Sequence, residues 1–245
     1  SLIKHMIKKV NNTIFLSIVV PVFNEEKTIT NVINELIYLK KICKIEIIVV
    51  NDGSTDKSKK IINNNKSKIS KIIHFEKNKG KGKAVIEGIK NCKGDYILVQ
   101  DADLEYDPKD IKKFITKIKE GVADCILGSR FIGSERSVLH FWHMIGNKFI
   151  TTLFNILNNT AFSDIYCCYL LFKKNAIKTQ KLKSYGWGQH AEILTFVIKN
   201  SNKPFEIAVR YNSRTYKDGK KIKYYNVFEV VYWIISTRIK TIFSS

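Results

Sequence analysis

Two stretches of the sequence decide the fold class: residues 16–26, LSIVVPVFNEE, and residues 45–56, IEIIVVNDGSTD. Each opens with a short apolar run rich in β-branched residues, Leu16 to Val20 and Ile45 to Val50, and each ends in polar turn residues. Runs of this length are typical of strands that are buried on both faces. Because residues from about 27 to 40 have a helical pattern, the two stretches predict a βαβ unit with parallel strands.

The same alternation of strands and helices continues to about residue 130. We expect strands over 71–75, 96–100 and 125–128 and helices over 56–64, 84–91 and 110–120. Beyond residue 130 the pattern becomes more helical and aromatic, with one late strand over 204–210. We therefore predict an α/β fold in which helices flank a mostly parallel central sheet.

The composition is typical of one globular domain, but it does not identify the molecule that the chain binds. The chain has 245 residues, of which 44% are apolar, and its formal net charge of +20 favours an anionic partner. The excess is mostly lysine, and isoleucine and asparagine are also heavily used, so a coding bias is an alternative source of the charge. A nucleic-acid-binding module is a remote alternative, because the lysines are dispersed and no recognition helix or RNP-like strand is evident.

The cysteines and the hydropathy pattern bear on the compartment. Five cysteines without paired or His-linked spacing predict neither a disulfide framework nor a zinc site, and they fit a reducing cytoplasm. The N-terminal residues lack the continuous apolar region of a signal peptide. No apolar run reaches the roughly 18–20 residues that a spanning helix needs. We therefore expect a cytoplasmic protein that does not cross a membrane by itself.

Polar residues gather at the ends of the predicted strands, which is where open parallel sheets bind ligands. The first strand ends in Pro21-Val22-Phe23-Asn24-Glu25, and either a ligand contact or capping of the next helix explains its polar residues. The second ends in Asn51-Asp52-Gly53-Ser54-Thr55, where capping accounts for Ser54 and Thr55. Capping does not need Asp52, which is suited to accept a hydrogen bond from a nucleobase N–H or a ribose hydroxyl.

The third polar strand end is Gln100-Asp101-Ala102-Asp103-Leu104-Glu105, which gathers three carboxylates. In extended backbone alternate side chains point to one side, so these carboxylates repel one another unless a cation lies among them. Hard oxygen ligands of this kind suit Mg²⁺ or Mn²⁺, and such a cation would bridge these carboxylates to the diphosphate of a donor substrate. A solvated acidic loop is the alternative.

A basic, glycine-rich turn, Asn78-Lys79-Gly80-Lys81-Gly82-Lys83-Ala84, opens the helix expected over 84–91. It begins like GxGxxG, but Val85 stands where the third glycine belongs, so the pattern gives little support to a dinucleotide-binding turn. A turn of this kind is suited to contact a phosphate through its backbone N–H groups, and a solvated turn is the equal alternative.

Taken in order, these motifs resemble family 2 glycosyltransferases, specifically the dolichyl-phosphate mannose or glucose synthase-like branch. The resemblance runs from about residue 16 to 225, because Gly128-Ser129-Arg130-Phe131, Asp164-Ile165-Tyr166-Cys167-Cys168 and Tyr211-Asn212-Ser213-Arg214-Thr215-Tyr216 also match that branch. It implies a GT-A fold, a nucleoside-diphosphate sugar donor and inversion at the anomeric carbon.

The resemblance also implies roles for individual residues. Nucleotide contacts fall on Pro21, Val22, Asn24, Glu25, Asp52, Ser54, Lys81, Asp101 and Ala102, and metal contacts on Asp101, Asp103 and Glu105. An acceptor phosphate would face Arg130, Arg136, Arg214, Lys220 and Lys221, and the candidate catalytic residues are Asp103, Glu192 and Asp164. The chain departs from the family at Asn51, where Asp is commoner, and at Gln189-His190, where many relatives carry Glu-Pro.

The chemical nature of the acceptor decides whether a base is needed. A sugar hydroxyl needs a general base, for which Glu192 and Asp164 are the candidates, and a structural cap or ion pair is the alternative for Asp164. A phosphate monoester is largely dianionic at neutral pH, since its second pKa lies near about 6, and it needs placement rather than deprotonation. Arginine holds such a group through its planar bidentate fork.

The C-terminal residues 226–243 place Val227, Val230, Val231, Ile234 and Ile235 at helical spacing, with Arg238 and Lys240 following. Such a helix lies either in a bilayer interface or against the core or a dimer partner. We expect an N-terminal extension over 1–15, a GT-A domain over 16–225 and this amphipathic helix over 226–245.

The resemblance therefore implies an inverting hexosyltransferase that moves a sugar from a UDP- or GDP-linked donor to a polyprenyl phosphate. The expected cofactor is Mg²⁺ or Mn²⁺, and the expected location is the cytoplasmic face of a membrane, with peripheral contact and no nucleic acid. Transfer to a glycan hydroxyl in cell-envelope polysaccharide assembly is the alternative, and an integral-membrane partner or a homo-oligomer is left open.

Overall fold

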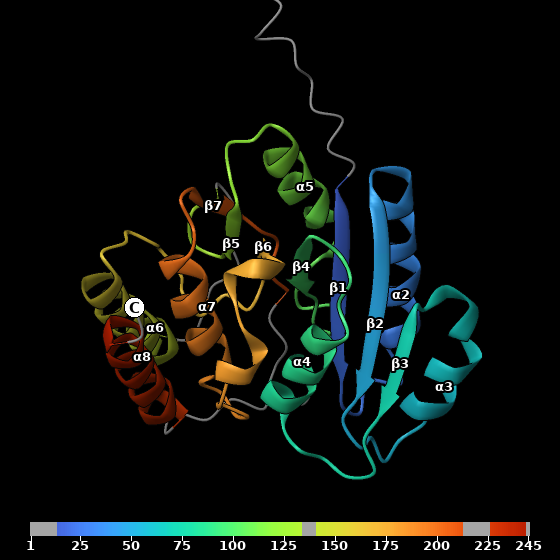
Figure 1. The fold of residues 1–245 in the computed structure, drawn as a ribbon. Coiled ribbons are helices and arrows are strands. Elements are labelled where there is room, and N and C mark those ends of the chain that lie inside the picture. The colour runs from blue at the N-terminus through green and yellow to red at the C-terminus, as the bar shows by residue number, and fades with distance from the viewer. Residues whose placement is uncertain (1–13, 134–140, 213–225, 244–245) are drawn as a thin grey trace, which may run out of the picture.

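The computed structural model describes residues 14–133, 141–212 and 226–243, which form a seven-stranded mixed sheet with helices on both faces (Figure 1). The strands are β1 (Phe15–Val22), β2 (Lys44–Asn51), β3 (Lys71–His74), β4 (Tyr96–Val99), β5 (Cys125–Ser129), β6 (Leu170–Lys173) and β7 (Pro204–Ala208). The helices are α2 (Ile29–Tyr38), α3 (Ser58–Asn64), α4 (Lys81–Lys90), α5 (Ile111–Lys119), α6 (Phe141–Asn158), α7 (Gln189–Lys199) and α8 (Asn226–Phe243).

The sheet has the order β3-β2-β1-β4-β6-β5-β7. β1 is parallel to β2 and β4, β2 is parallel to β3, and β5 is parallel to β7. Only β6 runs against its neighbours β4 and β5 in the part of the chain that the structure describes. The predicted α/β fold with a mostly parallel sheet is confirmed, and β6 is a strand that the sequence pattern did not indicate.

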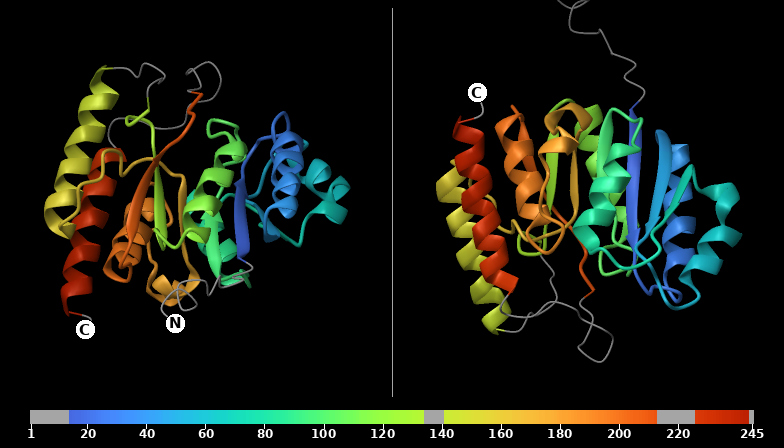
Figure 2. Two further views of the ribbon diagram at one scale, coloured as in Figure 1. Left: turned by 90° about the horizontal axis from the view of Figure 1, so that it is seen from above. Right: turned by 60° about the horizontal axis from the view of Figure 1, so that its bottom comes forward.

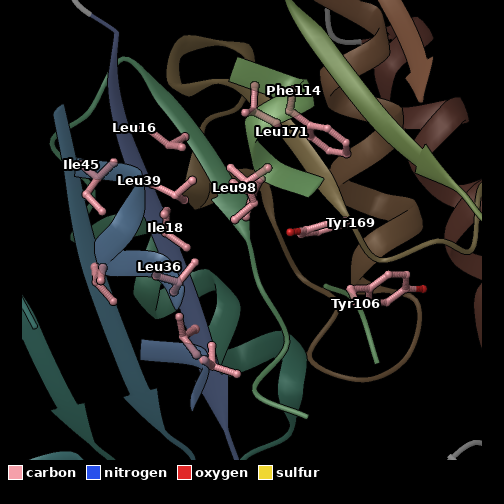
Figure 3. Close-up of a cluster of buried hydrophobic side chains, with 14 of the residues drawn as sticks. Leu16, Ile18, Leu36, Leu39, Ile45, Leu98, Tyr106, Phe114, Tyr169 and Leu171 are labelled. Atoms are coloured by element: carbon pink, nitrogen blue, oxygen red, sulfur yellow. The ribbon is translucent and has the colours of Figure 1, made fainter. Parts of the chain in front are cut away.

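Burial of both faces of the sheet explains the apolar strand sequences. Along β1, Leu16, Ile18 and Val20 pack in a buried cluster with α2 and α5, whereas Val19 points the other way and packs in a second cluster with α4. Figure 3 shows the first cluster, in which Leu36 of α2 lies over Ile18. Because each fully buried side chain of this kind contributes about 1.5–3 kcal/mol, the two cores fix the strands and bring their polar ends to one edge.

α6 and α8 lie side by side at the end of the molecule farthest from α3 (Figure 1, Figure 2). In α8 the buried positions Val230, Ile234, Thr237 and Thr241 recur at helical spacing and form the side that packs on the protein. α8 is the C-terminal helix expected from the sequence.

Candidate active site

β1 is the strand at which the order of the chain reverses, because β2 and β3 extend the sheet on one side of it and β4 is added on the other. A reversal of this kind leaves a crevice beyond the carboxyl ends of the strands. A cavity of about 370 Å³ opens there. Among the predicted site residues it is lined by Pro21, Val22, Glu25, Asp52, Lys81, Asp101, Ala102, Asp103, Glu105 and Arg130.

Asn24 and Ser54 do not line this cavity, but they join the two loops that do. The Oδ1 atom of Asn24 accepts a hydrogen bond from the Thr55 N–H at 2.8 Å, and the Oγ atom of Ser54 accepts one from the Asn24 N–H at 3.0 Å. Asn24 has a φ of 56°, in the left-handed region that asparagine tolerates better than most residues. The alternative that these side chains cap helices is not what the structure shows, because α2 and α3 begin after Thr28 and Lys57.

Asp52 holds the glycine-rich turn against the end of β2. Its two carboxylate oxygens accept hydrogen bonds from the N–H groups of Lys79 at 2.7 Å and Gly80 at 3.0 Å. Burial raises the pKa of Asp52 above its ordinary value, while these two N–H groups act in the opposite direction. Gly53 next to it has a φ of +66°, and a Cβ there would lie 2.4 Å from the carbonyl carbon of Lys77. Asp52 and Gly53 therefore set the shape of the cavity wall.

Lys81 begins α4 and pairs with the first carboxylate of the acidic motif. Its Nζ atom lies 2.7 Å and 2.8 Å from the two carboxylate oxygens of Asp101. Burial on its own would lower the pKa of Lys81, but the negative charge of Asp101 outweighs it and the pKa is raised. The pair keeps Lys81 charged and places a cation beside the acidic motif.

Asp103 lies close to two other carboxylates of the acidic motif, Asp101 and Glu105. Burial, and after it the charges of Asp101 and Glu105, raise the pKa of Asp103 to about 7. The Tyr211 hydroxyl donates to Glu105 at 3.2 Å, so one of these carboxylates is already committed to a protein contact.

The carboxylates of the acidic motif fit a divalent cation that is shared with a ligand. Across the described ranges, no three His, Cys, Asp or Glu side chains are grouped as a complete metal site. Mg²⁺ is usually held by only one or two carboxylates together with substrate phosphates. Asp101 and Asp103 are oxygen donors of that kind, and both line the cavity.

Arg130, which lines the cavity, forms a buried ion pair with Asp164. The Nε and Nη2 atoms of Arg130 donate to the two oxygens of Asp164 at 2.7 Å and 2.8 Å, and Asn147 donates to Asp164 at 2.8 Å. The Asp164 side chain is fully buried and that of Arg130 is 12% exposed. Burial would raise the pKa of Asp164, but the Arg130 charge outweighs it and holds the pKa below the ordinary range. This is the ion pair that the sequence left as the alternative to a base, and only Arg130 of the two lines the cavity.

Glu192 lies on the first turn of α7 and does not line the cavity. Its carboxylate is buried and accepts hydrogen bonds from the N–H groups of Lys183 at 3.0 Å and Ser184 at 2.9 Å. In the same turn His190 is buried, and burial, followed by the positive charge of Lys81, lowers its pKa to about 4. Its Nε2 atom has no hydrogen-bond partner among the residues that the structure describes. The Glu192 carboxylate thus shapes the segment before α7, and His190 is a neutral imidazole.

Several cavity residues were not singled out from the sequence. Tyr106 follows the acidic motif, and Gly186 and Trp187 come from the segment before α7, where a tryptophan between two glycines was the only signal. Tyr166, Cys168 and Tyr211 also line the cavity, although the sequence motifs assigned them no role. The predicted acceptor contacts Arg136, Arg214, Lys220 and Lys221 lie outside the described residues.

The chain is similar in sequence to known glycosyltransferases. The sequence model described as Glycosyl transferase family 2 matches residues 17–180. An uncharacterized protein of Methanocaldococcus jannaschii is 31% identical over 82% of this chain and 88% of its own length. A dolichyl-phosphate β-glucosyltransferase of Trichomonas vaginalis is 29% identical over 86% of this chain and 69% of its own length. A dolichol-phosphate mannosyltransferase of Pyrococcus furiosus is 27% identical over 89% of this chain and 64% of its own length.

Two solved structures share the fold. Glucosyl-3-phosphoglycerate synthase from Mycobacterium tuberculosis, in complex with Mn²⁺, UDP and phosphoglyceric acid, superposes with a TM-score of 0.66 at 16% identity, covering 92% of this chain and 78% of that one. S. aureus TarS 1–349, in complex with UDP-GlcNAc, superposes with a TM-score of 0.61 at 19% identity, covering 91% of this chain and 66% of that one. At these identities the likeness establishes the GT-A fold that the sequence predicted.

Proposed function

Because this chain belongs to glycosyl transferase family 2, we propose that it transfers a sugar, with inversion, from a nucleoside-diphosphate donor to a polyprenyl phosphate. The observation that carries the proposal is the composition of one cavity. The carboxylates of Asp101 and Asp103 line it together with the cations of Lys81 and Arg130. A diphosphate donor needs a site for a divalent cation, and a phosphate acceptor needs a guanidinium or ammonium group. Relatives named for dolichyl-phosphate glycosyl transfer align over 86–89% of the chain and support this choice of acceptor.

The nucleoside would lie at the ends of β1 and β2. Pro21, Val22, Glu25 and Asp52 form that wall, and Asn24 and Ser54 hold the two loops together behind it. Asp52 already accepts two backbone hydrogen bonds, and each of its oxygens has a second lone pair for a ribose hydroxyl or a nucleobase N–H. The wall is thus fixed before the donor binds, which limits the entropy lost on binding.

The donor diphosphate would lie beside the acidic motif. Mg²⁺ or Mn²⁺, held there by Asp101 and Asp103, would neutralise the charge that develops on the leaving diphosphate. Lys81 pairs with Asp101 and lies at the first turn of α4, where a helix favours anions. Lys81 could therefore donate a hydrogen bond to a diphosphate oxygen while it pairs with Asp101. Glu105 would be the third carboxylate near the metal ion.

The acceptor phosphate would bind Arg130. The pair with Asp164 uses two of the five N–H donors of the guanidinium and fixes its plane, which leaves three donors directed elsewhere. A dianionic phosphate oxygen then attacks the anomeric carbon, the bond to the diphosphate breaks, and the nucleoside diphosphate leaves with the bonding electrons. No proton has to be removed from such an acceptor. Asp164 and Glu192 already accept hydrogen bonds from protein groups, which agrees with a reaction that needs no base. Arg136, Arg214, Lys220 and Lys221 remain proposed acceptor contacts.

A polyprenyl acceptor requires the enzyme to work at a membrane surface. No helix in the described parts of the chain is long and apolar enough to cross a bilayer. Both helices at the end of the molecule nevertheless expose apolar side chains at helical spacing. These residues are Phe141, Trp142, Ile145, Phe149 and Ile156 on α6 and Phe228, Tyr232, Ile235, Ile239, Ile242 and Phe243 on α8.

We assign these two outer faces to an anionic bilayer interface, on the cytoplasmic side. Aromatic and aliphatic side chains beside lysine and arginine are the composition of interfacial helices. α6 and α8 carry Lys148, Arg238 and Lys240 against the single acid Glu229, and the whole chain has a net charge of +20. Attraction to anionic headgroups therefore adds to burial of the apolar side chains.

The decisive experiment is sugar transfer from a panel of UDP- and GDP-sugars to undecaprenyl phosphate in detergent, with Mn²⁺ or Mg²⁺ and then with EDTA. We expect a lipid-phosphate sugar whose formation stops with EDTA, and the panel names the donor. Hydrolysis of a donor without a lipid product would redirect the acceptor assignment to a glycan hydroxyl. Absence of any donor turnover would refute the proposed reaction.

A further inference from the structure

Residues 183–188, here called the wall segment, run along one side of the cavity just before α7. Gly186 and Trp187 of this segment line the cavity, together with Tyr166 from the loop before β6. The family motifs quoted from the sequence do not include these six residues. Their backbone is not part of a helix or strand, so its position depends on the contacts that neighbouring elements make with it.

Three different elements hold the wall segment. Glu192 of α7 accepts hydrogen bonds from its first two N–H groups, at Lys183 and Ser184. The N–H group of Gly82 in α4 donates to the carbonyl of Tyr185 at 3.0 Å. Glu229 of α8, 41 residues away in the chain, accepts a hydrogen bond from the last N–H group, at Gly188, at 3.2 Å. The segment is thus fixed at its beginning, middle and end.

α8 approaches the wall segment so closely that a side chain at Gly188 would overlap Trp233, and one at Gly186 would displace the Glu229 carboxylate. A Cβ on Gly186 would lie 2.4 Å from the Oε1 atom of Glu229, and a Cβ on Gly188 would lie 2.1 Å from the Cδ1 atom of Trp233. Glu229 and Trp233 are four residues apart and therefore share one face of α8. This face touches the two glycines that flank the cavity residue.

We propose that Glu229 is a positioning residue for the cavity, holding Gly188 and thereby fixing Trp187 where it packs against the donor sugar. An aromatic ring offers a large apolar contact area, and its effect on binding depends on the ring being held in one place. The inference rests on the proposed function, because it takes the cavity to be the donor site. α8 also carries the exposed apolar side chains assigned to the bilayer, so one helix joins the membrane face to the cavity wall.

The test compares Glu229→Leu with Glu229→Gln in the full chain. Leucine removes the acceptor at similar size, whereas glutamine keeps an oxygen for the Gly188 N–H. With UDP-glucose, or the donor that the panel identifies, we expect Glu229→Leu to raise the KM for the donor about ten-fold with a smaller change in kcat. Ten-fold corresponds to about 1.4 kcal/mol, which is within the range for the net contribution of one hydrogen bond. Glu229→Gln should stay within about two-fold of the wild type.

A second readout does not depend on turnover. Without any ligand, amide hydrogen exchange in residues 183–188 should become faster in Glu229→Leu and stay unchanged in Glu229→Gln. The matched control is Glu120→Leu, because Glu120 pairs with Lys117 at the exposed end of α5. If the wild-type chain turns over no donor, the proposed function fails, and the exchange rates still decide whether Glu229 holds the segment.

Two results would overturn the inference. One is a Glu229→Leu variant with wild-type donor KM and wild-type exchange in the wall segment. The other is a Glu229→Leu variant with a lower melting temperature and lower kcat but an unchanged donor KM, which is what a general loss of stability produces.

Discussion

The buried pair of Arg130 and Asp164 gives the sharpest prediction about stability. Each oxygen of Asp164 accepts two hydrogen bonds: Oδ2 from Nε and N of Arg130, and Oδ1 from Nη2 of Arg130 and Nδ2 of Asn147. In Asp164→Asn, whichever oxygen is replaced by the amide nitrogen then faces two N–H donors, and Arg130 loses its counter-charge. Breaking a buried pair from one side costs about 3–5 kcal/mol. For a chain of this length that corresponds to a fall in melting temperature of roughly 6–20 °C.

Urea unfolding followed by circular dichroism measures this loss. Glu120→Gln, which breaks an exposed pair with Lys117, is the control and should cost no more than about 1 kcal/mol. Adding Arg130→Met to Asp164→Asn should recover part of the loss, because no buried charge is then left without a partner. A loss below about 1 kcal/mol in Asp164→Asn, or no recovery in the double variant, would show that the pair is not buried and coupled as described.

The same pair predicts a pH dependence with a defined sign. The charge of Arg130 holds the folded-state pKa of Asp164 below its ordinary value of about 3.9. A carboxylate with a lowered folded pKa contributes stability that is complete above the unfolded pKa and is lost as the pH falls through the folded pKa. The stability difference between the wild type and Asp164→Asn should therefore be constant above about pH 5 and should shrink below about pH 4. A difference that grows as the pH falls would contradict this account.

Three further changes test the site, the membrane face and the loop packing. Asp103→Ala should abolish metal-dependent transfer while leaving the circular dichroism spectrum unchanged, since Asp103 follows β4 rather than lying in the core; full activity would remove it from the metal site. Phe228→Asp should weaken sedimentation with phosphatidylglycerol vesicles at least about ten-fold, whereas Tyr38→Asp at an exposed site on α2 should not. If Phe228→Asp bound the vesicles as well as the wild type, the α8 face would be excluded as the membrane contact. Gly53→Ala should lower the free energy of unfolding by about 1–3 kcal/mol, because φ at this position is positive and the added Cβ would overlap the Lys77 backbone. An unchanged urea midpoint would show that the loops move apart to accept the Cβ.

Strand and helix positions in the first half of the chain could be predicted because each element keeps one period over its length. β1 and β2 are apolar runs buried on both faces, and the helices between the strands bury one face each. β6 could not be found in this way. It runs antiparallel, and it follows the Asp164–Cys168 motif rather than a turn-rich connection. Its place in the sheet is decided by pairing with β4 and β5, which a local pattern does not contain.

The carboxylates show where sequence reasoning about the site ends. Asp103 and Glu192 are the same kind of candidate in the sequence, each an acidic residue in a motif of the family. In the structure Asp103 lies in the cavity among other carboxylates, whereas Glu192 accepts the N–H groups of Lys183 and Ser184. Hydrogen bonds from backbone N–H groups stabilise the charged form of a carboxylate and make it a weaker base. A carboxylate that is surrounded by like charges is stabilised by a nearby cation. The partners decide the role, and they come from segments whose approach only the folded chain defines.

An arginine that is paired with a buried aspartate suits a phosphate acceptor. An isolated guanidinium in the cavity lining has many rotamers and would lose their entropy when it binds a phosphate. Asp164, itself fixed by Asn147 and by its contact with the backbone N–H of Arg130, removes that freedom in advance. It also leaves the complex of the two side chains with no net charge, so a dianionic phosphate has to be balanced by additional cations. Lys81 in the same cavity is itself paired with Asp101, so this balance has to come from other cations. The basic residues at 214, 220 and 221 are the further ones that the family resemblance proposes, and their individual replacement should raise the acceptor KM without changing the donor KM.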